Sequence, residues 1–99
     1  MINDEVVTQR LAALAHPVRL SIVRLLIQVG SGGLAAGQIS EALNVPANAM
    51  TFHLQRLANV ELVQARRHGQ FMMYSASVET MVQLVSQIQA ISAGETSTP

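Results

Sequence analysis

Residues 36–74 read AGQISEALNVPANAMTFHLQRLANVELVQARRHGQFMMY, and this stretch decides the fold. It predicts a short helix over about 37–43, a tight turn over 44–46, and a second helix that runs to about Leu57. The asparagine of the turn favours the left-handed conformation that closes a helix, and its proline favours the start of the next. So short a connection between two helices is typical of a helix-turn-helix.

Two strand-like runs follow the second helix, over 62–67 and 70–76. His68-Gly69 predicts a two-residue hairpin turn between them. Cations on a short ribbon favour contact with phosphate or entry into a narrow minor groove, and a solvated charge cluster is the alternative interpretation. The tip of the predicted hairpin carries three potential cations: Arg66, Arg67 and His68.

Helices are also expected on both sides of this stretch. Asn3 is placed to cap a first helix, Pro17 opens a second that ends before Gly30, and Ser77 caps a last helix. Leu34-Ala35 is expected to pair as a small strand. The predicted fold is therefore mainly α with a small β-hairpin wing. It is a winged helix-turn-helix in the order helix, helix, short strand, helix, helix, strand, strand, helix.

The composition is unusually apolar for so short a chain. Of the 99 residues, 49% are hydrophobic and only 12% are charged. Much of the surface of so small a domain stays in contact with water, and no apolar run approaches the roughly 20 residues that cross a bilayer. The surplus therefore predicts a homodimer and no membrane segment. Apolar stripes on the first and last helices are the expected dimer surface: Val7, Leu11, Leu14, Met81, Leu84, Val85, Ile88 and Ile91.

One domain is expected over 1–93, responsible for DNA binding and dimerisation, with a disordered tail over 94–99. The N-terminus lacks the basic start and apolar core of a signal peptide, so the cytoplasm is the expected compartment. Cysteine is absent. Its absence excludes disulfides, thiolate metal sites and cysteine nucleophiles.

The distribution of charge favours DNA more than its sum does. The formal net charge is zero, which argues against nonspecific affinity for phosphate. Between His16 and Tyr74, however, five arginines stand against two glutamates. The middle of the chain is therefore basic and its ends are acidic.

The second helix of the helix-turn-helix has one apolar and one polar side. Met50, Leu54 and Leu57 follow helical spacing and are expected in the core. Asn48 and Thr51 then face outward, where an amide can read adenine and a hydroxyl can reach a base or a phosphate. Ordinary solvation of both side chains is the alternative interpretation.

Other candidates carry open alternatives. Phe52 is expected either to touch a thymine methyl or to pack under the wing or the second helix. His53 is expected to be structural and also to donate to a phosphate. Arg56 is expected to contact the DNA backbone or to pair with Glu61, and Arg19 to reach a phosphate or to close a salt bridge. The predicted DNA-binding residues are Ala47, Asn48, Thr51, Phe52, His53, Gln55, Arg56, Arg66, Arg67, His68 and Gln70.

The chain resembles the ArsR/SmtB family of bacterial winged-helix repressors. LAHPVRL at 14–20 is similar to the opening of the family's second helix, and MTFHLQRL at 50–57 is similar to its recognition helix. Leu62-Val63 and the run from Gly69 to Ser75 are similar to its wing. The resemblance implies a homodimer that binds an inverted repeat of double-stranded DNA and leaves it when an inducer, often a metal ion, arrives.

The sequence departs from the family at the metal sites. Ala35 and Gly37 stand where metal-sensing members carry a cysteine pair, and neither can bind a metal. A second family site uses carboxylates and histidine on the last helix, where 77–93 offers only Glu79. The three histidines, His16, His53 and His68, have no ligand-like spacing, and the methionines are better interpreted as packing residues. No metal and no cofactor is therefore expected.

A DNA-binding transcriptional repressor is the leading hypothesis, and a winged-helix protein-interaction module that does not bind DNA is the alternative. An enzyme is the least favoured class, because no catalytic set, carboxylate pair or phosphate-binding glycine loop can be assembled. Release from DNA is expected to involve a small-molecule inducer between the first and last helices of the dimer, or no inducer at all. We favour the small molecule.

Overall fold

The computed structural model describes residues 3–95 and contains five helices and three strands in the predicted order. Apart from Gly94 and Glu95, the predicted tail lies outside the described residues. The elements are α1 (Asp4–Leu14), α2 (Pro17–Val29), β1 (Leu34–Ala35), α3 (Ala36–Leu43), α4 (Ala47–Asn59), β2 (Val63–His68), β3 (Phe71–Ala76) and α5 (Val78–Ser92).

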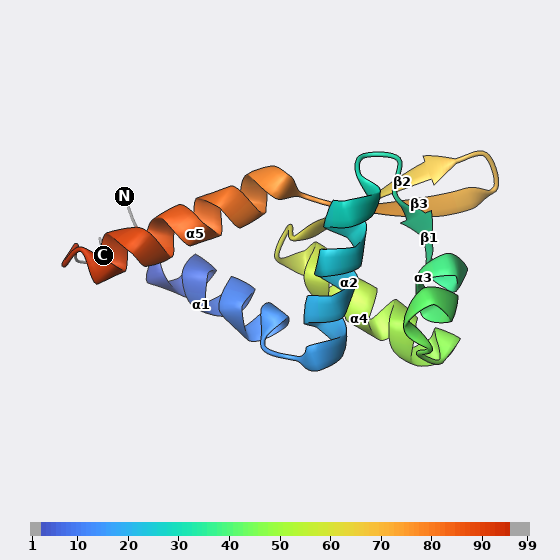
Figure 1. The fold of residues 1–99 in the computed structure, drawn as a ribbon, viewed down its shortest axis with the longest axis horizontal. Helices are drawn as coiled ribbons and strands as arrows, with labels where there is room; N and C mark the ends of the chain where they lie inside the picture. Colours follow the sequence, from blue (N-terminus) through green and yellow to red (C-terminus); the bar gives the residue numbers. More distant parts are fainter. Residues whose placement is uncertain (1–2, 96–99) are drawn as a thin grey trace.

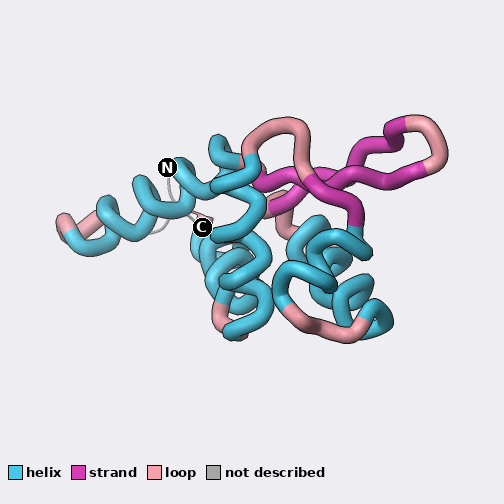
Figure 2. Tube along the Cα trace, turned by 45° about the vertical axis from the view of Figure 1, so that its right-hand side comes forward, coloured by secondary structure: helices cyan, strands magenta, loops and turns pink. Residues whose placement is uncertain are grey.

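The molecule is elongated, with extents of 45 × 23 × 22 Å. Figure 1 shows α2, α3 and α4 packed together below the sheet, with α1 and α5 side by side at one end of the molecule. The β2–β3 hairpin projects from the other end, as the tube in Figure 2 also shows. No described helix is by itself long and apolar enough to cross a bilayer, and α1 and α2, which reach that length only together, meet at 95°.

Side-chain caps fix where the helices begin. Asn3 Oδ1 accepts hydrogen bonds from the amides of Glu5 and Val6, and Ser77 Oγ accepts one from Thr80, so both predicted caps are confirmed. His16 Nδ1 accepts from the amide of Val18 at 3.2 Å and so caps α2, a role that the sequence did not suggest. Such caps satisfy amides that have no partner within the helix.

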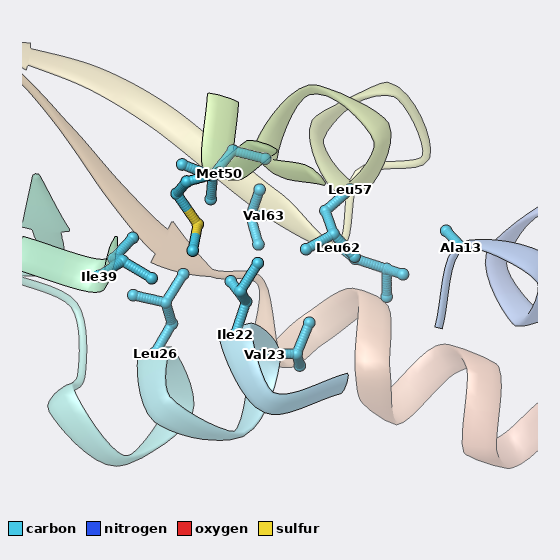
Figure 3. Packing of buried hydrophobic residues seen from close by; sticks show 10 residues of the cluster. Ala13, Ile22, Val23, Leu26, Ile39, Met50, Leu57, Leu62 and Val63 are labelled. Atoms are coloured by element: carbon cyan, nitrogen blue, oxygen red, sulfur yellow. The ribbon is translucent and has the colours of Figure 1, made fainter. Parts of the chain in front are cut away.

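The core lies between α2, α4 and the base of the sheet (Figure 3). Met50, Leu54 and Leu57 are buried as predicted, and Ile22 and Leu26 meet them from α2. Val29, the last residue of α2, lies at the end of the apolar stripe and is 42% exposed. Val23, on the other edge of the same stripe, is buried instead.

The sheet has the strand order β1-β3-β2, with both pairs antiparallel. His68 pairs with Phe71, so the turn is Gly69-Gln70 and the predicted turn at His68-Gly69 was wrong by one residue. Gly69 has φ +64°. A tight hairpin turn with a positive φ at its first central position favours glycine there, which explains the shift.

The turn of the helix-turn-helix is built as predicted. Asn44 has φ +54°, and the Val45 amide donates back to the Ser40 carbonyl at 3.0 Å. Pro46 precedes the first residue of α4. This short connection holds α3 against α4 and leaves one side of α4 in the solvent.

Candidate nucleic-acid interface

The outer side of α4 is exposed to solvent. Asn48 and Thr51 are exposed, and the Oδ1 atom of Asn48 accepts from the Ala49 amide at 2.9 Å. That bond orients the Asn48 side chain and leaves its amide NH₂ free for a ligand. The Thr51 hydroxyl donates to the Ala47 carbonyl at 3.2 Å and keeps its lone pairs available. The exposed predicted residues of α4 are Ala47, Asn48, Thr51, Phe52, Gln55 and Arg56.

Phe52 lies in the solvent. Its side chain is 61% exposed, and its nearest aromatic ring is that of His53, at 6.1 Å between centroids. The alternative that it packs under the wing or against α2 is therefore wrong. An exposed aromatic ring on this side of α4 can contact a base or an apolar partner.

His53, by contrast, turns toward the protein. It is half-buried, its ring lies 4.7 Å from that of His16, and its Nδ1 lies 3.4 Å from Arg19 Nη1. Because arginine can only donate, this contact requires an unprotonated Nδ1. Burial, followed by the charges of His16 and Arg19, lowers the pKa of His53. The expected structural role agrees with this position, and the neutral ring is not a cation for phosphate.

The depressed pKa of His53 predicts a pH dependence of stability. The unfolded chain binds this proton more tightly, so the contribution of His53 is complete above pH 6.5 and is lost as pH falls toward the folded-state pKa. We expect the melting temperature to fall between pH 7 and pH 5, and to fall less in His53→Asn. Thermal denaturation followed by circular dichroism would measure this, with His68→Asn on the exposed wing as control. Equal pH profiles for His53→Asn and the native protein would contradict the assignment.

Arg19 is buried and bonds within the protein. Its Nε donates to the carbonyl of Ala13 at 2.6 Å, at the end of α1. Both alternatives from the sequence, a phosphate contact and a salt bridge, are therefore wrong for Arg19. Arg56 is exposed, and the alternative that it pairs with Glu61 is also wrong, because Glu61 pairs with Arg10.

The wing exposes its polar residues on both faces. In the register of the hairpin Arg66 lies opposite Met73, and Arg67 lies opposite Met72. Side chains of directly paired residues share a face, and successive residues alternate, so the two arginines lie on opposite faces. The exposed predicted wing residues are Arg66, Arg67, His68 and Gln70.

A hollow of about 650 Å³ separates the wing from α3. Phe71 and Met73 supply its apolar wall from β3, and Gly37 forms part of the opposite side. Arg66 shares the Met73 face and therefore lies on the same side of the ribbon as the hollow. The residues that line the hollow are Ala35, Gly37, Gln38, Glu41, His68, Phe71 and Met73.

The predicted dimer residues separate into two groups. Val7 and Leu84 bury each other between α1 and α5, and Met81 and Leu14 are half-buried against the core. The apolar stripe of α5 therefore packs partly within its own chain. The others remain exposed on α1 and α5, joined by one residue that the sequence reasoning missed, Val82. The exposed members are Leu11, Val82, Val85, Ile88 and Ile91.

Within residues 3–95, no three histidine, aspartate or glutamate side chains lie close enough to hold a metal ion. Ala35 and Gly37, which the resemblance aligned with metal-ligand positions, offer no metal ligand and line the hollow. The geometry thus presents a helix and a hairpin for a macromolecule, and an apolar hollow beside them.

Comparisons with known proteins identify the family. A helix-turn-helix domain model matches residues 14–64. The chain is 30% identical over 81 residues to the HTH-type transcriptional regulator YgaV of Escherichia coli, covering 82% of this chain and 80% of that protein. It is also 30% identical to a solved structure from Mycobacterium bovis, the homodimeric winged helix-turn-helix DNA-binding domain of Mb0332, a possible ArsR-family regulator. The TM-score is 0.72, with 90% and 80% of the two chains covered. The chain belongs to the ArsR/SmtB family.

A further relative is a transcriptional regulator as well. The transcriptional repressor SdpR of Bacillus subtilis is 32% identical over 69 residues, which cover 70% of this chain and 73% of that protein. The chain is therefore a winged helix-turn-helix transcriptional regulator, as the sequence predicted, and not an enzyme. The resemblance stated from the sequence is confirmed.

Proposed function

We propose that this regulator is a homodimeric repressor that binds an inverted repeat of double-stranded DNA in the cytoplasm. One observation carries the proposal: α4 buries one side in the core and presents an exposed, mostly polar side to solvent, in a chain whose hairpin bears two exposed arginines. A helix of this kind fits the major groove, and the hairpin reaches the adjacent backbone or minor groove. The repressor SdpR and the homodimeric Mb0332 domain are consistent with it.

The arginines available for DNA are fewer than the sequence suggests. Arg10 and Arg19 are buried in internal hydrogen bonds, which leaves four of the six exposed. Three of these, Arg56, Arg66 and Arg67, lie on α4 and the wing. Two copies would bring six cations to the duplex, so the logarithm of affinity should fall with the logarithm of salt with a slope of about −5.

Replacing both Arg66 and Arg67 by alanine should weaken DNA binding at least about tenfold and reduce the salt slope by about 4, because a dimer then loses four phosphate contacts. Fluorescence anisotropy on a duplex from the region upstream of the gene measures both. Arg24→Ala is the matched control, since Arg24 is exposed on the side of α2 opposite the core.

The single variants should differ from each other, because Arg66 and Arg67 lie on opposite faces of the hairpin. Unchanged affinity in the double variant would remove the wing from the interface. No binding by the native protein to upstream fragments, or binding without two-fold symmetry in a footprint, would refute the proposed function.

A protein-interaction module is the second candidate, favoured by the exposed ring of Phe52 and the zero net charge. It predicts a partner protein on the outer side of α4 and no DNA footprint. Capture of partners with and without nuclease separates the two candidates. A partner that survives nuclease and is lost in Phe52→Ala supports the module.

We also propose that a small organic inducer binds in the hollow between α3 and the wing, in place of the expected site between α1 and α5. Its volume lies within the range of small-molecule pockets, and its wall is mostly apolar with a few polar groups, including Gln38 and Glu41. A molecule seated there touches both the helix-turn-helix and the hairpin. It can therefore change the position of the wing relative to α4.

Leucine in place of Gly37 should fill the hollow and abolish the response to an inducer while leaving the fold intact. A Cβ at Gly37 meets no atom within 4 Å, so the substitution is sterically open. A thermal-shift screen of small aromatic and aliphatic metabolites should give compounds that stabilise the native protein and not Gly37→Leu. Gly32→Leu is the matched control, because its Cβ also meets open space and Gly32 does not line the hollow. Compounds that stabilise both variants equally would place the inducer elsewhere.

A further inference from the structure

Arg10 on α1 is a buried cation whose whole guanidinium is engaged. Arg10 is only 7% exposed. Nε donates to the Val60 carbonyl at 3.1 Å, Nη2 to Glu61 Oε2 at 3.2 Å, and Nη1 to Gln83 Oε1 at 2.8 Å. Val60 and Glu61 follow the last residue of α4, and Gln83 lies on α5. One side chain therefore connects α1, α5 and the end of α4.

Glu61 adopts a backbone conformation that glycine normally takes. Its φ is +66°, its amide donates to the Ala58 carbonyl at 3.0 Å, and the Leu62 amide donates to the Leu57 carbonyl at 3.0 Å. These two bonds are the Schellman closure of a helix, in which the left-handed position is usually glycine. A glutamate is disfavoured there. Its carboxylate, which glycine lacks, holds Arg10 in the only salt bridge within residues 3–95.

The connection has a defined direction. A guanidinium is planar and presents its donors in a fixed fork. Two of its acceptors lie at the end of α4 and the third lies on α5, so the three bonds fix the orientation of α1 and α5 relative to the end of α4. The main apolar cluster also reaches α1 through Ala13 and α5 through Met81, and the smaller cluster packs α1 on α5. Apolar contacts are non-directional. The bonds of Arg10 therefore supply an orientation that these contacts do not.

We infer that Arg10 is a positioning residue that fixes the recognition helix relative to α1 and α5, and thereby sets the distance between the two recognition helices of the dimer. The inference rests on the proposed function, in which α4 of a homodimer enters the groove, and takes the exposed apolar side chains of α1 and α5 as the two-fold interface. Two recognition helices at a fixed distance select one separation of half-sites. Without the three bonds, α4 and the dimer helices can shift against each other, and this selection weakens.

The test compares half-site spacings. The native protein first selects its operator from a pool of random duplexes, and variants of that operator are made with one or two base pairs added to or removed from its centre. We expect Arg10→Met to remain a folded dimer by circular dichroism and sedimentation. Its preference for the native spacing over the altered ones should fall about tenfold. A residue that only stabilises the fold would lower affinity for all spacings alike, and that result would overturn the inference.

Three further variants sharpen the test. Arg10→Lys retains the charge without the fork and should also lose spacing selectivity, and it substitutes for Arg10→Met if that variant does not fold. Glu61→Asn keeps a residue that tolerates positive φ but removes the carboxylate, and should lose part of the selectivity. Arg24→Met, which removes an arginine exposed on α2, should retain it. If the native protein selects no duplex, the proposed function fails as well. If it selects one and the Arg10 variants keep their spacing preference, only this inference fails.

Discussion

Glutamate in place of Ile88 is expected to turn the dimer into a monomer and to lower its affinity for an inverted-repeat duplex by roughly two orders of magnitude or more. Ile88 is 41% exposed on α5, beside Val85 at 49% and Ile91 at 47%. Apolar side chains grouped at this density on one helix are typical of an interface. A charge placed among them must be desolvated when the copies associate, and the two-fold axis repeats that cost in both subunits.

The loss of DNA affinity follows from the loss of linkage between half-sites. A dimer that holds one half-site presents its second recognition helix at a high effective concentration to the other, whereas a monomer binds each half-site independently. Sedimentation velocity gives the oligomeric state, and anisotropy with full and half operators gives the affinities. Ile88→Glu should bind the full and half operators with equal strength.

Ser86→Glu is the matched control for this prediction. Ser86 is also exposed on α5 but lies on a different side of the helix from Val85, Ile88 and Ile91, so the same charge is placed away from these three side chains. It should remain a dimer. If Ile88→Glu also remained a dimer with native affinity, the interface would have to use another surface.

Local sequence patterns were sufficient to predict the elements of this fold. Asn44 and Ser77 each act through atoms within a few residues along the chain, so a short window contains all that determines a helix end. The burial of Met50 and Leu54 follows from the 3.6-residue period alone. The outer side of α4 followed by exclusion, since residues that do not face the core face the solvent.

The arginines show what local patterns do not contain. Arg10 binds groups that lie 50, 51 and 73 residues away, and Arg19 meets His53 across 34 residues. Nothing near either arginine distinguishes it from Arg56, which is exposed. Whether an arginine serves the DNA or the fold depends on acceptors that only the tertiary structure brings together. The sequence therefore left the role of Arg19 open and suggested none for Arg10.

The same limit explains the expectation for the dimer helices. The apolar residues of α5 recur at helical spacing along the whole helix. This period does not show that Leu84 packs on Val7 of the same chain while Ile88 stays exposed. Only the packing of α1 against α5 divides the stripe into an internal and an external part. The positive φ of Glu61 was not predicted for a related reason: the residue that binds its carboxylate, Arg10, lies far away in the sequence on α1.

Alanine in place of Gly33 should destabilise the folded protein by about 3 kcal/mol or more, which for a domain of this size lowers the melting temperature by about 12 °C or more. Gly33 has φ +70°, a region that alanine enters only with strain of about 1–2 kcal/mol. A Cβ at this position would also overlap the backbone carbonyl of Tyr74 in β3. Leu34 pairs with Tyr74, so β3 cannot move away without opening the sheet at the base of the wing.

The adjacent glycine provides the control that isolates this cause. Gly32 occupies the same loop, but a Cβ there meets no atom within 4 Å and its φ is not in the left-handed region. Gly32→Ala should therefore leave stability within about 0.5 kcal/mol of the native value or raise it slightly, because alanine restricts the unfolded chain. Urea denaturation at one fixed protein concentration compares the two variants with the same contribution from dimer dissociation. Equal stability of both variants would mean that the β1–β3 junction yields to the methyl group, and that the wing is less firmly joined to the core than its pairing indicates.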